Sequence, residues 1–167
     1  MTVRLILGGA RSGKSHRALE LAEGLATTRV FVATAEPFDA EMADRIEQHR
    51  NDRGPEWSTR EAPLDLVAEV EPALLPDSVV VVDCLTLWLS NLMHAGRDVQ
   101  AETAALIQLF TMPGELILVS NEVGLGIVPE TPLGRRFRDE QGWLNRTVAA
   151  ACDRVELIVA GLPLVLK

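Results

Sequence analysis

Eight residues near the start of the chain have the types and the spacing of a phosphate-binding loop. They follow the Walker A order, a glycine, four residues and then Gly-Lys-Ser, and they are Gly8, Gly9, Ala10, Arg11, Ser12, Gly13, Lys14 and Ser15. Glycines let successive backbone N–H groups curve around phosphate oxygens, and a helix that begins there adds its partial positive charge. In this pattern Lys14 reaches the β- and γ-phosphates, and the Ser15 hydroxyl binds Mg²⁺. The loop therefore predicts binding of a magnesium-bound nucleoside triphosphate.

The use of lysine in the chain supports this interpretation. Of the 16 basic residues only Lys14 and Lys167 are lysines, so arginine is preferred almost everywhere else. The planar guanidinium of arginine does not replace a compact ammonium inside a phosphate cradle. The pattern thus favours a phosphate-binding Lys14 over a glycine-rich turn that holds no ligand.

A second motif, which ends in an acidic residue, complements the glycine loop. Residues 79 to 83 form an apolar run, Val-Val-Val-Val, that ends in Asp83. This is a Walker B pattern, in which the carboxylate holds Mg²⁺ directly or through water. Many buried strands end in an aspartate that only caps the next helix, so the pattern is informative mainly because the glycine loop is also present. We expect Ser15 and Asp83 to be the protein ligands of one Mg²⁺ ion.

The elements that must position these residues alternate between strands and helices. Strands are predicted at 3–7, 29–34, 56–60, 78–83, 116–120, 155–160 and 164–166, mostly as continuous apolar runs of the kind buried on both faces of a parallel sheet. Helices are predicted at 16–25, 39–51, from Pro63, at 85–93, at 99–110 and at 132–151 with an interruption at Gly142.

This order predicts an α/β fold with right-handed crossovers. We expect a three-layer, P-loop NTPase-like fold with a mostly parallel sheet of about seven strands. A tight turn at Gly161-Leu162-Pro163 predicts that the last strand is antiparallel and lies on the sheet edge. Without an internal repeat or a linker, residues 1–167 are expected to form a single nucleotide-binding domain.

Composition limits the classes of partner. The chain has 167 residues, 47% of them hydrophobic, and a formal net charge of −8 without a basic stripe, so a nucleic-acid partner is not expected. Cys84 and Cys152 have no metal-ligand spacing and do not indicate a disulfide scaffold. No apolar run has the length of a membrane span, so we expect a cytoplasmic protein without stable membrane insertion.

Residues 39–54 contain a histidine whose role the residues alone do not decide. On a helix, Met42, Ile46, His49 and Arg53 would share one face. A histidine near the C-terminal end of a solvated helix, where the dipole favours a cation, is the more common situation. The motifs around His49 favour a functional role instead.

The whole chain resembles the bifunctional adenosylcobinamide kinase/adenosylcobinamide-phosphate guanylyltransferase family of cobalamin biosynthesis. The shared motifs occur in order: GGARSGKS at 8–15, ATA at 33–35, DAEMADRIEQHRNDRG at 39–54, Trp57, EAP at 61–63, DCLTLWLSNL at 83–92, SNEVGLGIVPETPLGRRFRDEQGWLNR at 120–146, and VAGLPL at 159–164. A generic P-loop protein would share only the first of them.

The resemblance implies a two-step enzyme. It would phosphorylate adenosylcobinamide with ATP or GTP, and then transfer GMP from GTP to that phosphate, giving adenosylcobinamide-GDP and pyrophosphate. The histidine that carries GMP in the family falls on His49, the only histidine between residues 17 and 93. The family also implies a homotrimer. Beyond the glycine loop, it implies nucleotide contacts from Ala33, Thr34, Ala35, Arg50, Asn51, Asp52, Arg53, Glu61 and Asp83.

Several roles stay open at this level. Glu61 and Asp83 fit guanine, ribose or metal contacts equally well, and Thr34 fits a structural role. Ser120-Asn121-Glu122 closes a strand where open sheets bind ligands, either on the substrate side or as a loop cap. Two other functions compete with the main one, a kinase that has lost GMP transfer and a regulatory NTPase whose output is a conformational change. His49 argues against the first, because phosphorylating an alcohol does not need a nucleophilic histidine.

Overall fold

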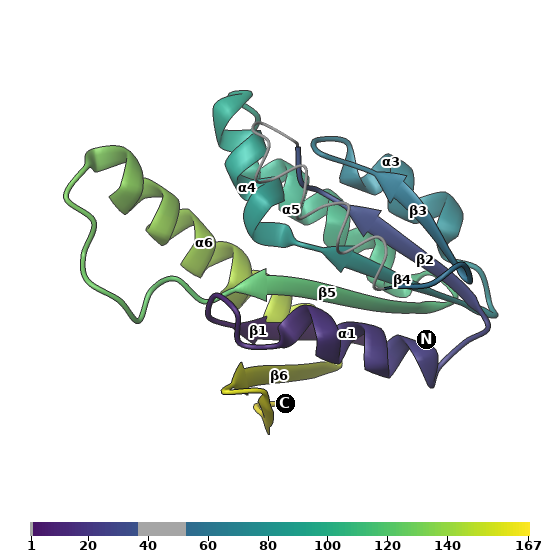
Figure 1. Cartoon of the computed structure of the whole chain (residues 1–167). Helices are drawn as coiled ribbons and strands as arrows, with labels where there is room; N and C mark the ends of the chain where they lie inside the picture. Colours follow the sequence, from purple (N-terminus) through teal and green to yellow (C-terminus); the bar gives the residue numbers. More distant parts are fainter. Residues whose placement is uncertain (1, 37–52) are drawn as a thin grey trace.

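The sheet has seven strands in the order β3-β2-β4-β5-β1-β6-β7 in the computed structural model, which describes residues 2–36 and 53–167 (Figure 1). All neighbouring strands are parallel except the edge pair β6–β7. The predicted fold class is confirmed. The strands are β1 Val3–Gly8, β2 Thr28–Ala33, β3 Trp57–Glu61, β4 Ser78–Asp83, β5 Glu115–Asn121, β6 Arg154–Val159 and β7 Leu162–Val165.

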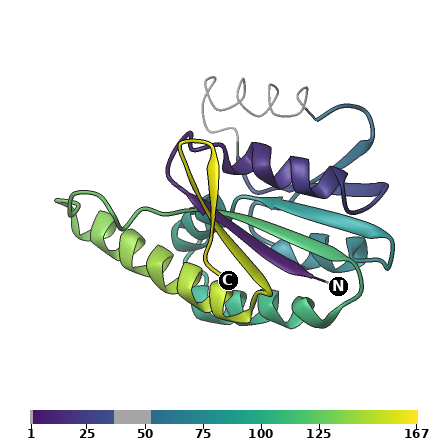
Figure 2. The same ribbon diagram turned by 90° about the horizontal axis from the view of Figure 1, so that it is seen from below.

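Helices cover both faces of the sheet, with α1 on one face and α4, α5 and α6 on the other (Figure 2). The predicted helix at 39–51 lies outside the described residues. Among the described helices, none is long and apolar enough to cross a bilayer. The α-helices are α1 Lys14–Glu23, α3 Leu66–Val70, α4 Leu85–His94, α5 Val99–Gln108 and α6 Pro132–Ala151, with short 3₁₀ turns at Glu71–Ala73 and Leu109–Thr111.

The core forms two layers because successive strand residues point to opposite faces. In β4, Val80 and Val82 belong to the larger cluster, which packs against α3 to α6, whereas Val79 and Val81 belong to the smaller one under α1. Strands buried on both faces need apolar residues at every position, which explains the continuous apolar runs in the sequence.

Three details of the predicted elements are wrong. Pro63 does not open a helix, since α3 begins at Leu66 after an Asp65 N-cap. The last helix is not interrupted at Gly142. Apolar and amide side chains before and after Gly142 are buried along one face of the helix, and this packing outweighs the cost of about 1 kcal/mol for a glycine inside a helix. The hairpin turn lies at Ala160 and Gly161, which have φ angles of 52° and 80°, the left-handed pair of a type I′ turn, so β7 starts directly after it.

The topology also separates β1 from β4 by one strand. β5 lies between them, so Asp83 is not on a strand adjacent to the glycine loop. All three strands are parallel, with Ile6 level with Val119 and Val119 level with Asp83. Their carboxyl ends therefore meet at one edge of the sheet, where open α/β folds bind ligands.

Candidate active site

The glycine loop joins β1 to α1 and needs glycine at two positions. Gly13 is the N-cap of α1 with φ 98°, a left-handed conformation that side chains disfavour. At Gly8 an added Cβ would lie 2.8 Å from the Ile158 carbonyl oxygen and closer still to the Ser12 hydroxyl. The loop is closed by the Ser12 N–H, which donates to the Gly9 carbonyl at 3.3 Å. The glycines at positions 8 and 13 therefore allow the tight loop conformation that the structure shows.

Lys14 is held in the loop as a largely desolvated ammonium. Its side chain is buried, and its Nζ donates to the Gly9 carbonyl oxygen at 2.8 Å. Burial lowers the pKa of Lys14, and the nearby Cys84 and Asp83 oppose this shift. Asp83 is thus near enough to act on the Lys14 charge, although β5 lies between their strands. A buried ammonium with one backbone partner is suited to bind an anion such as a phosphate.

We expect Lys14→Met to leave the ligand-free protein at least as stable at pH 7, with a gain of the order of 1 kcal/mol. The folded pKa of Lys14 lies below the unfolded pKa, so its charged form costs stability at neutral pH. This cost disappears as the pH rises through the folded pKa toward 10.5, the unfolded value. Gly9 is exposed, so its carbonyl regains water in the variant.

Thermal unfolding of wild type and variant at pH 7 and pH 10 measures this effect. The advantage of the variant should shrink at pH 10. A variant that is clearly less stable at pH 7 would contradict the inference that the ammonium is desolvated.

Cys84, next to Asp83, does not take part in acid–base chemistry at neutral pH. Burial raises the pKa of its thiol to about 12, so the thiolate that acts as nucleophile or metal ligand is absent. Within the described part of the chain, no group of three or more His, Cys, Asp or Glu side chains could hold a metal. One carboxylate and one hydroxyl suit Mg²⁺, which keeps several waters and shares its remaining positions with substrate phosphates. Asp83 and Ser15 therefore suit Mg²⁺ by their donor chemistry, and their binding to one shared ion stays a prediction.

Three predicted nucleotide contacts lie in one row at the carboxyl edge. Ala33 at the end of β2 is level with Glu61 in β3 on one side and with Asp83 in β4 on the other. Glu61 is exposed at this edge. The structure thus brings Glu61 to the same edge of the sheet as the loop, which the sequence motifs alone did not establish.

Thr34 has a structural role at this edge. It is fully buried, and its hydroxyl donates to the Cys84 carbonyl at 2.7 Å and accepts from the Cys84 N–H at 2.8 Å. The Asn91 side chain of α4 donates to the Thr34 carbonyl at 2.9 Å and to the Pro63 carbonyl at 3.0 Å. These bonds join the ends of β2 and β4 to α4, so Thr34 positions Asp83 rather than presenting its hydroxyl to a ligand.

Arg53 is buried against the middle of β2, on the face of the sheet that α1 covers. Its guanidinium carbon lies 3.6 Å from the centre of the Phe31 ring, and Trp57 meets that ring edge-on with centroids 6.4 Å apart. The guanidinium is thus held by a cation–π contact beside β2. The other predicted residues of this segment, His49, Arg50, Asn51 and Asp52, lie outside the described residues, so their predicted roles stay predictions.

A buried polar network, not predicted from the sequence, fixes the end of β5. The Gln141 amide donates to the Ser120 hydroxyl at 3.0 Å and to Asn145 Oδ1 at 2.9 Å, and the Ser120 hydroxyl itself donates to Asn145 Oδ1 at 2.7 Å. Asn145 donates to the Asn121 carbonyl at 2.9 Å, while the Asn121 N–H donates to Thr86 in α4 at 2.8 Å. The network holds the strand end between the glycine loop and Asp83.

A sequence signal for this network exists. Gln141, Leu144, Asn145 and Val148 form one stripe at helical spacing, and all four are buried. Two amides on an otherwise apolar stripe indicate buried hydrogen bonds. By contrast, Arg135 and Arg136 at the start of α6 are exposed, as expected for a solvated face.

Comparison with known proteins identifies the family. The profile of the family described as "Cobinamide kinase / cobinamide phosphate guanyltransferase" matches residues 4–166. The chain belongs to this family. The match includes the glycine loop, Asp83 and the buried network, and it confirms the resemblance noted from the motifs.

Curated relatives in the family are similar over nearly their full length. The chain is 48% identical to the bifunctional adenosylcobalamin biosynthesis protein CobP of Pseudomonas aeruginosa, over 98% of this chain and 96% of that protein. It is 37% identical to the bifunctional adenosylcobalamin biosynthesis protein CobU of Salmonella typhimurium, over 98% of each chain.

Solved structures support the fold. The flagellar accessory protein FlaH of Methanocaldococcus jannaschii superposes with a TM-score of 0.59 at 14% identity, covering 99% of this chain and 78% of that one. The RadB recombinase superposes with a TM-score of 0.54 at 12% identity, covering 93% and 73%. At these identities the similarity concerns the fold alone.

Proposed function

We propose that this protein phosphorylates adenosylcobinamide and then transfers GMP from GTP to the new phosphate, through a covalent intermediate on His49. The observation that supports this most is the family match over residues 4–166, in a chain whose buried Lys14 lies in a glycine loop with Asp83 near its charge. We further propose that residues 1–167 act as one nucleotide-binding unit.

In the first step, the acceptor hydroxyl attacks the γ-phosphorus of ATP or GTP and gives up its proton to solvent. The bond between the γ-phosphorus and the β–γ bridging oxygen breaks, and ADP or GDP leaves. The chain contributes positioning and positive charge: loop N–H groups and Lys14 bind the phosphates, and the α1 N-terminus adds its dipole. Mg²⁺, when bound by Ser15 and Asp83, would neutralise charge on the phosphates. Lys14 exchanges its bond to the Gly9 carbonyl for one to a phosphate oxygen.

In the second step, a ring nitrogen of His49 attacks the α-phosphorus of GTP and pyrophosphate leaves. The phosphate of adenosylcobinamide phosphate then attacks that phosphorus, the P–N bond breaks, and adenosylcobinamide-GDP forms. Histidine suits this role because a useful fraction of imidazole is unprotonated near neutral pH. Lys14 and the loop would stabilise the leaving pyrophosphate, so both steps use one triphosphate site. Arg50 and Arg53 are proposed to interact with the transferred or accepting phosphate.

Product analysis tests this function directly. Adenosylcobinamide, GTP and Mg²⁺ are incubated with the protein, and corrinoids and nucleotides are separated by chromatography. The proposal predicts adenosylcobinamide phosphate, then adenosylcobinamide-GDP with an equal amount of pyrophosphate. A kinase alone would stop at the phosphate, whereas a regulatory NTPase would release GDP and inorganic phosphate without changing the corrinoid.

Asp83→Asn is expected to raise the Mg²⁺ concentration needed for half-maximal rate by roughly 10- to 100-fold in both steps. The amide keeps the size of the side chain but lacks the negative charge that attracts the cation. Mg²⁺ titrations of each step measure this change.

Asp77→Asn is the matched control, because Asp77 is exposed and precedes β4 at its other end. If Asp83→Asn showed a wild-type Mg²⁺ requirement, Asp83 would not be a metal ligand.

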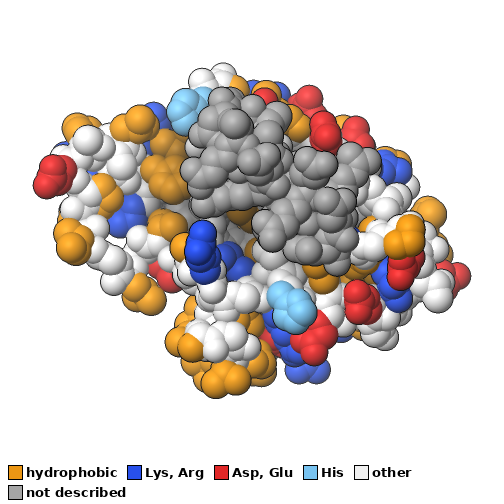
Figure 3. All heavy atoms as spheres, viewed as in Figure 1, with side chains coloured by type: hydrophobic (Ala, Val, Ile, Leu, Met, Phe, Trp, Pro, Cys, Tyr) orange, Lys and Arg blue, Asp and Glu red, His pale blue; other side chains and the backbone are white. Residues whose placement is uncertain are grey.

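Self-association and location complete the proposal. Apolar side chains gather on the loop before α6 and on the C-terminal hairpin (Figure 3). Ile127 is 97% exposed and Leu162 is 72% exposed, and such apolar surface is typical of protein interfaces. We propose a homotrimer, which light scattering would detect as three times the chain mass.

We also propose a cytoplasmic location, since Cys84 and Cys152 are both free thiols.

A further inference from the structure

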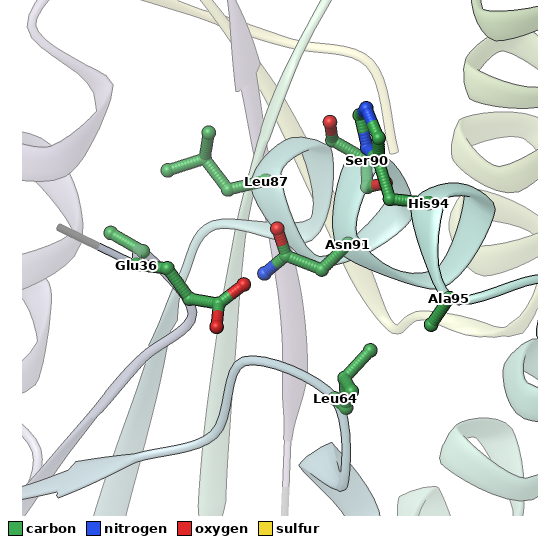
Figure 4. Close-up of a pocket in the computed structure, with 8 residues that line it drawn as sticks. Glu36, Leu64, Leu87, Ser90, Asn91, His94 and Ala95 are labelled. Atoms are coloured by element: carbon green, nitrogen blue, oxygen red, sulfur yellow. The ribbon is translucent and has the colours of Figure 1, made fainter. Parts of the chain in front are cut away.

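Two adjoining cavities lie along α4, beside the row of site residues. The first has a volume of about 460 Å³ and lies between the end of β2, Leu64 and one side of α4 (Figure 4). The second, of about 370 Å³, lies between α4 and the start of α6, where Met93 and Phe137 contribute apolar walls. Ser90 and His94 line both cavities. We call the two together the α4 trough.

The polar groups of the first cavity are mainly hydrogen-bond acceptors. Asn91 uses its amide nitrogen for the Thr34 and Pro63 carbonyls, which leaves its oxygen as the atom that can meet a ligand. His94 Nδ1 lies 2.7 Å from the Ser90 carbonyl oxygen. A carbonyl oxygen only accepts, so Nδ1 carries the proton and Nε2 of the neutral ring is an acceptor. Glu36 adds a carboxylate whose side chain is turned toward Asn91 (Figure 4).

This lining selects a chemical class of ligand. Leu64, Leu87 and Ala95 supply apolar surface, and no lysine or arginine lines the first cavity among the described residues. A phosphate is therefore disfavoured there, since acceptors and a carboxylate repel it. A neutral group with several N–H donors on an apolar frame fits instead. The volume is within the range of small-molecule sites, about 300–1,000 Å³.

We propose that the α4 trough binds the corrinoid acceptor through primary amide groups on the rim of its ring. This inference rests on the proposed function, which makes cobinamide a substrate. Ala35, which the family motif implies as a nucleotide contact, also lines the first cavity, and a purine base has N–H donors as well. A purine would occupy only part of the first cavity, whereas a corrinoid extends across both cavities, so we assign the trough to the corrinoid. Asn91 also connects the trough to the reaction site, because it holds Thr34, which in turn bonds to Cys84 beside Asp83.

Two substitutions that fill or alter the trough test the proposal. Ser90→Leu adds bulk where the cavities join, and His94→Leu removes the ring acceptor. The matched control is Gln108→Leu, at an exposed position of α5 that lines neither cavity. Cobinamide binding is measured by equilibrium dialysis from the visible absorbance of the corrin, and GTP binding by fluorescence of a labelled analogue.

We expect both trough variants to weaken cobinamide binding by about tenfold or more, the effect of losing one to two hydrogen bonds or of a steric block, while GTP binding changes less than about twofold. Gln108→Leu should bind both ligands as wild type does. His94 is exposed, so His94→Leu is expected to fold, and its thermal unfolding is checked against wild type.

Unchanged cobinamide binding in both variants would overturn the proposal. So would weakened GTP binding with normal cobinamide binding, which would assign the trough to the nucleotide base. If wild-type protein bound GTP but no cobinamide, the proposed function itself would fail, and this inference with it. The two failures can be told apart, because the first is seen in wild-type protein, whereas a wrong assignment of the trough leaves wild type able to bind cobinamide and the variants unaffected.

Discussion

Lys14→Ala is expected to slow both the phosphorylation of adenosylcobinamide and the transfer of GMP by about 10²- to 10³-fold, as removal of one preorganised electrostatic stabiliser does in other enzymes. The reason is that both reactions are proposed to use the triphosphate cradle in which Lys14 is buried. Each activity is measured separately, with γ-labelled nucleotide and adenosylcobinamide for the first, and α-labelled GTP and adenosylcobinamide phosphate for the second.

Lys14→Arg should restore little of either activity, because the guanidinium is larger and planar in a site shaped for a compact ammonium. The other lysine of the chain gives a control. Lys167 donates to the Ala150 carbonyl at 2.9 Å, in the last turn of α6, and its own carbonyl accepts from Val155 near the amino end of β6. It thus lies at the sheet edge opposite the glycine loop, so Lys167→Ala should retain both activities. If Lys14→Ala lost one activity and fully kept the other, the two reactions would not share a site.

His49→Ala should have the larger and more selective effect. We expect it to abolish acid-labile labelling of the protein by α-labelled GTP and the formation of adenosylcobinamide-GDP, while phosphorylation of adenosylcobinamide remains measurable. A covalent route requires its nucleophile, whereas phosphoryl transfer to an alcohol depends on positioning and charge. His49→Asn has a similar volume but no nucleophilic nitrogen, so it should behave in the same way.

The pH dependence gives an independent readout. Labelling of wild type should decline as the pH falls below about 6.5, the ordinary pKa of a histidine side chain, because imidazolium has no lone pair to attack phosphorus. His16→Ala, which changes an exposed histidine without a proposed role, is the control and should be labelled normally. Normal labelling of His49→Ala would assign the covalent role to another residue.

The strands could be predicted from sequence because of how they are buried. Runs such as Val79–Val82 face helices on both sides, so they contain no polar position and stand out from the rest of the chain. The glycine loop and Asp83 were recognisable because phosphate and Mg²⁺ binding restrict both residue type and spacing. The continuity of α6 through Gly142 was not, since tertiary packing there outweighs local propensity.

The supporting parts of the site depend on contacts between distant segments. Asn91 meets Thr34 and Pro63 across 57 and 28 residues of sequence, and Asn145 meets Asn121 across 24. The two amides on the buried stripe of α6 indicate that buried hydrogen bonds form there, but no local pattern specifies their partners. The pairings in the network at the end of β5, and the α4 trough, therefore emerge only from the fold. His49 is the opposite case, because its proposed role comes from the family motif and not from any local physical signal.

The most direct test of the central claim is a chase of the labelled protein. Wild type is incubated with α-labelled GTP and Mg²⁺, freed of nucleotide by rapid gel filtration, and then mixed with adenosylcobinamide phosphate. Transfer of GMP through His49 predicts that the label leaves the protein and appears in adenosylcobinamide-GDP, in equal amount and without added GTP. If the isolated protein carried no label, or kept its label when adenosylcobinamide phosphate was added, the covalent mechanism would be wrong.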